Sequence, residues 1–302
     1  MPPPTPEPAH ELPLPPARVT ATGVRILSGV PYADLPGARP LELDLYLPPA
    51  GDTPAPVIGF LHGGGWRLGS RRSLGPSYAG TTSHPFEQVA AAGLAVASVD
   101  YRLSGERTWP AQLHDAKAAV RWLRARGRDA GLDPERIGAW GESAGGHLAL
   151  LLGLTGNPAT HTDLDGDVGI VDGSSAVSAV ATWYAPSDLT ALPGDLGANP
   201  AADGTREAQL FGAPLSTVPE VVRQASPITY VSADVPPILL LHGDADRLIP
   251  SVQSVRLHAA LRDRGADVEL ETYPGADHMW LGSPEAAAAA LSRTVTFFRA
   301  RL

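Results

Sequence analysis

A serine set between glycines, where a strand turns into a helix, is the feature of this sequence best suited to chemistry. The segment 141–145 reads Gly-Glu-Ser-Ala-Gly, follows the apolar run 136–140 and precedes the apolar segment 146–154. So tight a turn lifts the serine oxygen above the sheet edge, and glycines two residues away on each side avoid collisions. The segment therefore predicts that Ser143 is an activated nucleophile. A glycine-rich loop without chemistry is the alternative from these five residues alone.

A second glycine cluster follows another apolar strand. Residues 62–66 read His-Gly-Gly-Gly-Trp and come directly after the expected strand 56–61. Acyl transfer needs N–H groups aimed at the oxyanion of its tetrahedral intermediate. A glycine loop at a strand end supplies such groups, together with the N–H of the residue after the nucleophile, Ala144. The alternative is a flexible turn.

Two further loops carry an acid and a histidine. The apolar strand 237–242 ends in a loop with Asp244 and Asp246, and the expected strand 268–273 leads to His278. The chain order is then serine, acid, histidine. This order distinguishes one class of Ser-His-acid triads from those of chymotrypsin and subtilisin.

Together these motifs resemble the α/β-hydrolase superfamily. Within it, the chain looks most like the esterase branch that includes hormone-sensitive-lipase-like enzymes and the bacterial feruloyl-esterase and acetyl-xylan-esterase-like group. The matching segments occur in the expected order; they are 62–66, 100–103, 141–147, 242–246 and His278. The resemblance implies an α/β fold with a mostly parallel sheet of about eight strands, helices on both faces and a small cap insertion. It is specific for the catalytic apparatus and poorly specific for the substrate.

The resemblance also assigns roles to individual residues. Ser143 matches the nucleophile, His278 the general base that later acts as an acid, and Asp246 the acid that orients the imidazole. The residues that match the oxyanion hole are Gly64, Gly65 and Ala144. No cofactor and no metal are expected.

Other acids and histidines compete for these roles. Asp244 lies closer to the strand end and is expected to bond backbone N–H groups of its own turn, as Asp often does. Among the histidines, His62 is expected to support the glycine loop. His147 lies about one helical turn after Ser143, so it faces along the helix. Only His278 lies in a loop after the acid.

Four residues beside these loops are candidates for substrate binding. They are Trp66, Glu142, Trp183 and Trp280. Aromatic walls are frequent in ligand sites, but core packing explains the tryptophans equally well. If all three tryptophans face the cleft, the acyl pocket is small and favours acetyl to butyryl esters.

The remaining sequence alternates between strands and helices, which is typical of an α/β domain. Residues 1–20 read as a Pro-rich tail, and 21–302 as the catalytic domain with a cap at 185–235. The expected strands are 23–28, 41–47, 56–61, 94–99, 136–140, 177–184, 237–242 and 268–273. The expected helices are 84–92, 111–127, 146–154, 251–264 and 285–300, with weaker helical pieces at 205–211 and 218–225. Residues 155–176 are acidic and Gly-rich and read as a solvated loop.

Composition excludes several classes of function. The net charge of -9 disfavours nucleic acid and anionic membranes as partners. The absence of cysteine excludes disulfides, thiol catalysis and cysteine-based metal sites. Neither a secretory signal nor a membrane span is recognisable, which favours a cytoplasmic location. A homodimer is left open.

The sequence thus predicts a hydrolase of small or short-acyl carboxylic esters that forms an acyl-serine intermediate. An amidase or formamidase, or a small peptidase, would use the same triad. A non-catalytic ligand-binding protein of this fold is a more distant alternative, because fold does not fix function.

Overall fold

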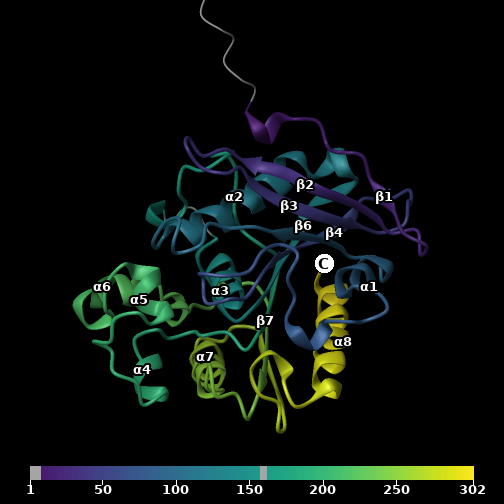
Figure 1. Cartoon of the computed structure of the whole chain (residues 1–302). Coiled ribbons are helices and arrows are strands. Elements are labelled where there is room, and N and C mark those ends of the chain that lie inside the picture. The colour runs from purple at the N-terminus through teal and green to yellow at the C-terminus, as the bar shows by residue number, and fades with distance from the viewer. Residues whose placement is uncertain (1–7, 157–161) are drawn as a thin grey trace, which may run out of the picture.

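The computed structural model describes residues 8–156 and 162–302. Its centre is a single nine-stranded sheet in the order β1-β2-β3-β5-β4-β6-β7-β8-β9 (Figure 1). The six neighbouring strands β5-β4-β6-β7-β8-β9 are parallel to one another. The pairs β1–β2, β2–β3 and β3–β5 at the other edge are antiparallel. Strand bounds are β1 Arg18–Val19, β2 Arg25–Ala33, β3 Leu41–Leu47, β4 Ala55–Leu61, β5 Ala95–Val99, β6 Leu132–Glu142, β7 Ala179–Trp183, β8 Ile238–Gly243 and β9 Val268–Tyr273.

The central strands are mostly apolar and are buried along their whole length, because helices cover both faces of the sheet. Every residue of β5, β7 and β8 is buried. Such continuous apolar runs are typical of parallel strands, and the predicted strands are confirmed at their expected places. One difference is that β6 begins at Leu132 rather than Arg136, because Leu132 pairs with Ala55 ahead of the main register.

Five longer helices form the two outer layers. They are α1 Pro85–Ala91, α2 Ala111–Arg126, α3 Ala144–Thr155, α7 Val252–Asp263 and α8 Pro284–Arg301. Side chains of α2, α3 and α7 share one buried apolar cluster, whereas those of α1 and α8 belong to a second one. The two clusters are the cores on opposite faces of the sheet. The expected fold class, α/β with a mostly parallel sheet, is confirmed.

Part of the Pro-rich tail is integrated into the fold. The short helix η1, Ala9–Glu11, precedes β1. The His10 carbonyl accepts hydrogen bonds from Trp122 Nε1 at 3.3 Å and Arg126 Nη1 at 2.7 Å, both on α2. Residues 1–7 of the predicted tail lie outside the described residues. The tail boundary predicted at residue 20 therefore stays a prediction.

The acidic segment 155–176 is tied to α2, in contrast to the expected solvated loop. Lys117 is buried and donates to the Thr155 carbonyl at 2.8 Å and to Asp165 Oδ1 at 2.6 Å. Arg121 donates to three backbone carbonyls of the segment, at Asp165, Val168 and Ile170. These cations explain how an acidic segment can pack against the domain. Residues 157–161 lie outside the described part of the chain.

The long connection between β7 and β8 carries three short helices. They are α4 Leu192–Asp195, α5 Arg206–Phe211 and α6 Pro219–Gln224, and Figure 1 shows them together at one side of the molecule. The weak helical pieces predicted in this connection match α5 and α6, whereas α4 was not predicted. We call residues 185–235 the cap segment.

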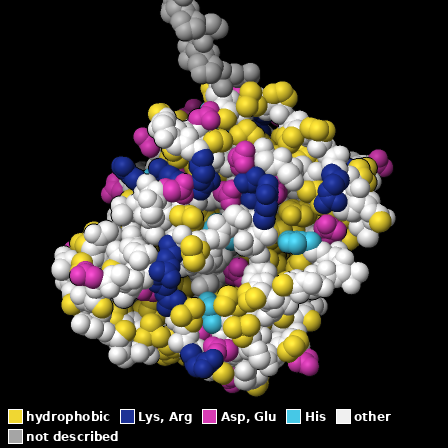
Figure 2. All heavy atoms as spheres, viewed as in Figure 1, with side chains coloured by type: hydrophobic (Ala, Val, Ile, Leu, Met, Phe, Trp, Pro, Cys, Tyr) yellow, Lys and Arg dark blue, Asp and Glu magenta, His cyan; other side chains and the backbone are white. Residues whose placement is uncertain are grey.

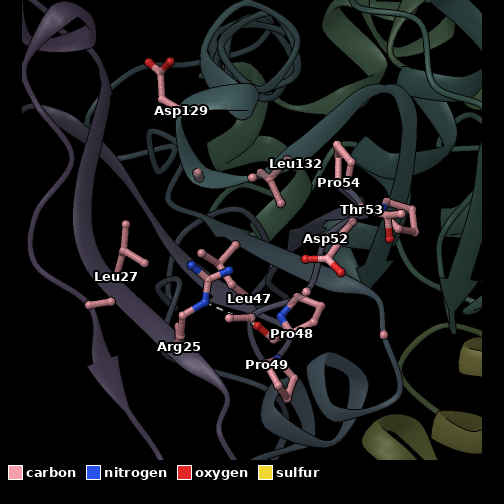
Figure 3. A pocket seen from close by; sticks show the side chains of 18 of the residues that line it. Arg25, Leu27, Leu47, Pro48, Pro49, Asp52, Thr53, Pro54, Asp129 and Leu132 are labelled. Atoms are coloured by element: carbon pink, nitrogen blue, oxygen red, sulfur yellow. Dashed lines mark hydrogen bonds between the residues drawn. The ribbon is translucent and has the colours of Figure 1, made fainter.

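An open cavity of about 720 Å³ lies at the end of the sheet where β4 and β6 begin (Figure 3). Residues at the start of β4 and β6 line it, together with Arg25 and the proline-rich turn after β3. This end carries none of the sequence motifs described above. Within residues 8–156 and 162–302, no helix is long and apolar enough to cross a membrane.

Candidate active site

The turn between β6 and α3 has the strained geometry that its sequence predicts. Ser143 has a φ of +52°, a conformation that residues other than glycine seldom adopt. A Cβ added to Gly141 would lie 2.2 Å from the Gly145 carbonyl oxygen, and one added to Gly145 would lie 2.0 Å from that of Leu61. Only glycine fits at either position. The predicted sharp corner is therefore confirmed.

Three side chains from distant parts of the chain meet at this corner. Ser143 Oγ lies 3.0 Å from His278 Nε2, and His278 Nδ1 lies 2.7 Å from Asp246 Oδ2. Asp246 follows β8 and His278 follows β9, so all three stand at the carboxyl ends of parallel strands. Ser143 keeps 8% of its surface exposed, which leaves it accessible within a mostly buried site. The serine, acid and histidine expected from the sequence are thus joined by hydrogen bonds.

The carboxylate of Asp246 is held by more than the histidine. Its Oδ1 accepts from the N–H groups of Leu248 at 2.9 Å and Ile249 at 2.8 Å, and His242 Nε2 lies 3.4 Å from Oδ2. Burial alone would raise the pKa of Asp246. The hydrogen bonds from His242 and His278 outweigh burial and hold this pKa well below its usual range. Asp246 is therefore ionised at neutral pH.

Asp244 lies apart from this chain of contacts. It is exposed, and its Oδ1 accepts the N–H of Gly275 at 2.7 Å. Its partner belongs to the neighbouring histidine loop instead of its own turn, which differs in detail from the expectation. Asp244 thus connects the loops that carry Asp246 and His278.

The glycine loop has a backbone that other residues could not adopt. Gly64 has a φ of +112° and Gly65 a φ of +61°, and a Cβ on Gly64 would lie 2.2 Å from the Leu68 carbonyl oxygen. Within residues 8–156 and 162–302, the N–H groups of Gly64 and Gly65 donate to no protein acceptor. Ala144 is the first residue of α3, where N–H groups also lack intrahelical partners. Each of the three expected oxyanion donors therefore has an N–H available to a ligand.

Glu142 contacts two loops, although it was predicted to bind substrate. Its Oε1 accepts from the N–H groups of Gly63 and Gly75, each at 3.3 Å, and its Oε2 accepts from the Tyr184 hydroxyl at 2.7 Å. The residue is only 4% exposed, and burial raises the pKa of its carboxyl despite these three donors. Glu142 therefore holds the glycine loop in place from below the surface.

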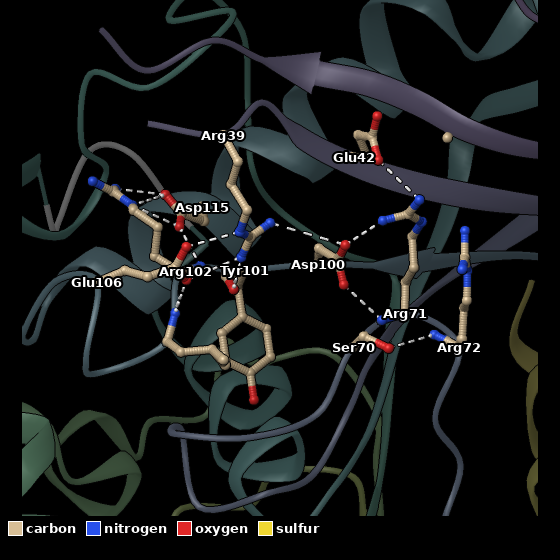
Figure 4. A network of polar contacts seen from close by, with 12 residues as sticks. Arg39, Glu42, Ser70, Arg71, Arg72, Asp100, Tyr101, Arg102, Glu106 and Asp115 are labelled. Carbon is tan, nitrogen blue, oxygen red and sulfur yellow. Dashed lines mark hydrogen bonds and ion pairs between the residues drawn. The ribbon is translucent and has the colours of Figure 1, made fainter. Parts of the chain in front are cut away.

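The motif at 100–103 supports the same loop from another direction. The Tyr101 hydroxyl donates to the His62 carbonyl at 2.8 Å, and its ring stacks on His62 at a centroid distance of 4.3 Å. Figure 4 shows the adjacent ion network, in which Asp100 pairs with Arg71 and Arg71 also binds Glu42 at 2.8 Å. The expected role of His62 agrees with its hydrogen bond from Nδ1 to the Gly63 carbonyl, at 2.7 Å.

The other histidine and the three tryptophans are structural. His147 lies between Trp66 Nε1, at 3.3 Å, and the Ala225 carbonyl, at 2.7 Å, and burial lowers its pKa to about 4. Its ring is thus held by Trp66 and Ala225, which agrees with the expectation that it faces along the helix. Trp66, Trp183 and Trp280 are at most 1% exposed. Of the two interpretations of these tryptophans, the structure favours core packing, which corrects their assignment to substrate binding.

Three residues near the site were given no role from the sequence, although two of them lie in the matching segments 100–103 and 242–246. Tyr184 packs its ring 4.6 Å from that of His278 and donates to Glu142. His242 binds the Ile249 carbonyl at 2.8 Å beside Asp246, and Tyr101 holds the glycine loop. Each lies at or directly after a buried strand, which is the signal that could have indicated them. The partners of Tyr101 and Tyr184 lie about 40 residues away, so those contacts had no local signature, whereas His242 binds a residue seven positions later.

The face shown in Figure 2 is hollowed near its middle. Lys and Arg side chains stand on several sides of the hollow, with acidic and histidine side chains closer to it. Among the described residues, no group of three or more His, Cys, Asp or Glu side chains could hold a metal ion.

Comparisons with known proteins agree with this architecture. The family model BD-FAE matches residues 43–261. Esterase LipQ of Mycobacterium tuberculosis is 33% identical over 263 residues, which are 83% of this chain and 56% of that protein. The chain thus spans about half the length of the curated relatives that it matches.

Two solved structures are similar over nearly their whole length. A truncated carbohydrate esterase from gut microbiota has a TM-score of 0.80 and 30% identity, covering 94% of this chain and 98% of the other. Propionate-bound esterase 2 of Thermogutta terrifontis has a TM-score of 0.70 and 25% identity, covering 93% and 96%. These likenesses confirm the expected α/β-hydrolase fold and the resemblance to its esterase branch.

Proposed function

This chain belongs to the BD-FAE family, and we propose that it hydrolyses small carboxylic esters through an acyl-serine intermediate. The observation that carries the proposal is the hydrogen-bonded series Ser143–His278–Asp246, with distances of 3.0 and 2.7 Å. A buried, ionised acid behind a histidine is the arrangement that activates a serine hydroxyl. The names of the relatives, which are esterases, favour an ester as the substrate.

Acylation begins with the serine hydroxyl. As Ser143 Oγ forms a bond to the acyl carbon, its proton passes to His278 Nε2. The Asp246 carboxylate stabilises the resulting imidazolium through the contact with Nδ1. When the bond between the acyl carbon and the alcohol oxygen breaks, His278 returns the proton to the departing alcohol, which leaves an acyl group on Ser143.

The glycine loop and the start of α3 supply the electrostatic part of the reaction. The N–H groups of Gly64, Gly65 and Ala144 are the proposed donors to the oxyanion of the tetrahedral intermediate. Removing one such donor typically raises the barrier by about 3–4 kcal/mol. The buried Glu142 and Tyr101 keep the loop in position, so the donors need no rearrangement when charge develops.

Deacylation reverses the roles with water in place of the alcohol. His278 takes a proton from water as the water oxygen bonds to the acyl carbon. The bond to Ser143 Oγ then breaks, the serine regains its proton from the imidazolium, and a carboxylic acid leaves. No cofactor is needed to balance either half-reaction.

We propose that the acyl group of the substrate is short. The expectation from the sequence was a small pocket lined by three tryptophans, but these are buried in the core and give no support. Support comes instead from the propionate bound to the related Thermogutta terrifontis esterase, a three-carbon acid. A cytoplasmic location and a homodimer stay predictions.

The experiment that tests the proposal is hydrolysis of p-nitrophenyl acetate, butyrate and octanoate. Ser143→Ala should lower turnover by more than about 10³-fold, because the nucleophile is lost. Ser292→Ala, an exposed serine on α8, is the matched control and should keep full activity. If Ser143→Ala matches the wild type, or the wild type acts only on amide substrates, the ester proposal is wrong.

A further inference from the structure

One arginine of the cap segment touches both loops that complete the site. Arg206 is the first residue of α5, and its stem lies against Gly65 of the glycine loop. Its Nη2 donates to the Leu248 carbonyl at 3.0 Å, in the loop that carries Asp246. The glycine loop follows β4, whereas the loop that carries Asp246, here called the acid loop, follows β8. Arg206 is thus a side chain from a third segment that joins them.

The stem of Arg206 closes the space beside the oxyanion donors. A Cβ placed on Gly65 would lie 3.2 Å from Cδ and 3.4 Å from Cβ of Arg206. The stem of Arg206 therefore lies directly beside Gly65 and leaves little room for a side chain there, which limits how far this part of the loop can shift toward the cap segment. Because the N–H of Gly65 has to point at the oxyanion, restricting that movement keeps the N–H directed toward this oxygen.

The guanidinium of Arg206 acts on the acid loop. The Leu248 carbonyl that it binds belongs to the residue whose N–H donates to Asp246 Oδ1, at 2.9 Å. The N–H of Ile249 donates to the same oxygen at 2.8 Å. Fixing the position of Leu248 therefore fixes the orientation of the Asp246 carboxylate. That carboxylate in turn orients the His278 imidazole.

Arg206 can serve this purpose because α5 is itself fixed. The Thr205 side chain caps the helix by accepting the N–H of Ala208 at 3.0 Å. The carbonyl of Leu210, in the last turn, accepts the N–H of Trp109 from the main domain at 2.8 Å. Glu207 binds Arg206 Nε at 2.6 Å, which restricts the rotation of the guanidinium. Arg206 thus belongs to a helix, α5, that is hydrogen-bonded to the main domain.

We propose that Arg206 is a positioning residue that fixes the glycine loop and the acid loop relative to each other. This inference rests on the proposed esterase function. It assigns the cap segment a part in the chemical step. The stem and the guanidinium act on different loops, so their contributions are separable by substitution.

Three substitutions separate the two contacts. Arg206→Met keeps much of the stem but loses the bond to Leu248, Arg206→Ala loses both, and Arg206→Lys restores a donor. Activity on p-nitrophenyl acetate should be normalised to the sites titrated by a p-nitrophenyl phosphonate, which reacts with the serine. We expect kcat to fall by about 10²-fold in the alanine variant and about 10-fold in the methionine variant, as for a slightly misplaced reacting group. Lysine should recover part of the loss.

Two further readouts exclude a merely structural role. KM for the neutral ester should change less than about twofold, because Arg206 acts on the aim of catalytic groups and leaves ground-state binding unchanged. The pH profile of kcat should shift in Arg206→Met, because the acid that orients His278 is released. Arg223→Met, which removes an exposed arginine of the same cap segment paired with Glu220, should change none of these quantities.

Several results would overturn the inference. An unchanged kcat per titrated site, with only a lower melting temperature, would make Arg206 a stabilising residue alone. A rise in KM confined to esters that carry a carboxylate would make it a substrate-binding residue instead. Both results leave the esterase proposal intact if Ser143→Ala is inactive. Full activity of Ser143→Ala would instead remove the esterase proposal itself.

Discussion

Two buried carboxylates lie close to His278, and their surroundings differ in kind. Asp246 is bound by His278, by two backbone N–H groups and by a contact with His242. Glu142 is bound by two backbone N–H groups and the Tyr184 hydroxyl. The pKa of Asp246 is held below its usual range, whereas burial raises that of Glu142.

The difference shows how one chemical group serves two purposes. Beside Asp246 stands an imidazole that can become a cation, so its charge has a partner that appears during the reaction. The donors around Glu142 are neutral and two of them are long, at 3.3 Å, so burial outweighs them. Asp246 is suited to electrostatic stabilisation, whereas Glu142 is suited to holding loops together.

Removing the charge of Asp246 should have the largest effect. In Asp246→Asn the imidazole loses its anionic partner and adopts the wrong tautomer, so kcat should fall by roughly 10⁴-fold. Asp244→Asn is the matched control, because this exposed acid in the same loop binds the Gly275 N–H and does not contact His278 within residues 8–156 and 162–302. Steady-state kinetics on p-nitrophenyl acetate measures both. An equal loss in the two variants would contradict the distinction drawn between these acids.

Removing the Glu142 side chain should have the next largest effect. Glu142→Ala leaves the N–H groups of Gly63 and Gly75 without their acceptor, so the glycine loop loses its support. We expect kcat to fall about 10²-fold, the scale of a small misplacement of catalytic groups. Glu142→Gln keeps an acceptor for both N–H groups and should retain most of the activity. If glutamine is as inactive as alanine, the charge of Glu142 matters and the comparison fails.

Tyr184→Phe tests the remaining donor to Glu142. It deletes one hydrogen bond to a buried acid, which should lower the free energy of unfolding by about 2 kcal/mol. The ring contact with His278 is kept, so kcat should change less than the stability does. Urea denaturation measures the first quantity and ester hydrolysis the second. A loss of activity without a loss of stability would place Tyr184 in the reaction itself.

The pH dependence of stability should have opposite signs for the two acids. A lowered pKa means that the contribution of Asp246 is present above its usual value of 3.8 and is lost as pH falls. A raised pKa means that the contribution of Glu142 is present below its usual value of 4.5 and is lost as pH rises. Urea midpoints of wild type, Asp246→Asn and Glu142→Gln between pH 3 and 7 should therefore diverge in opposite directions. Parallel curves would show that the two carboxyl groups titrate alike.

The local sequence was sufficient to predict most strands and the longer helices, and the serine, acid and histidine that it indicates lie in one hydrogen-bonded series. Continuous apolar runs mark β4, β5, β7 and β8, because parallel strands are buried on both faces. The boundaries were less predictable where tertiary pairing extends an element, as at the start of β6, where Leu132 pairs with Ala55. The segment after α3 was expected in solvent because its own residues are polar and acidic. Its partners, Lys117 and Arg121, lie on another helix.

The sequence by itself determined which groups can react. A glycine-flanked serine at a strand–helix corner, a three-glycine loop and an acid and histidine after later strands are local patterns, and sterics gives each a reason. Tertiary structure alone decided which side chains hold those groups in place. Glu142, Tyr101 and Arg206 act through partners 30 or more residues away, and such contacts depend on distances that spacing along the chain does not encode.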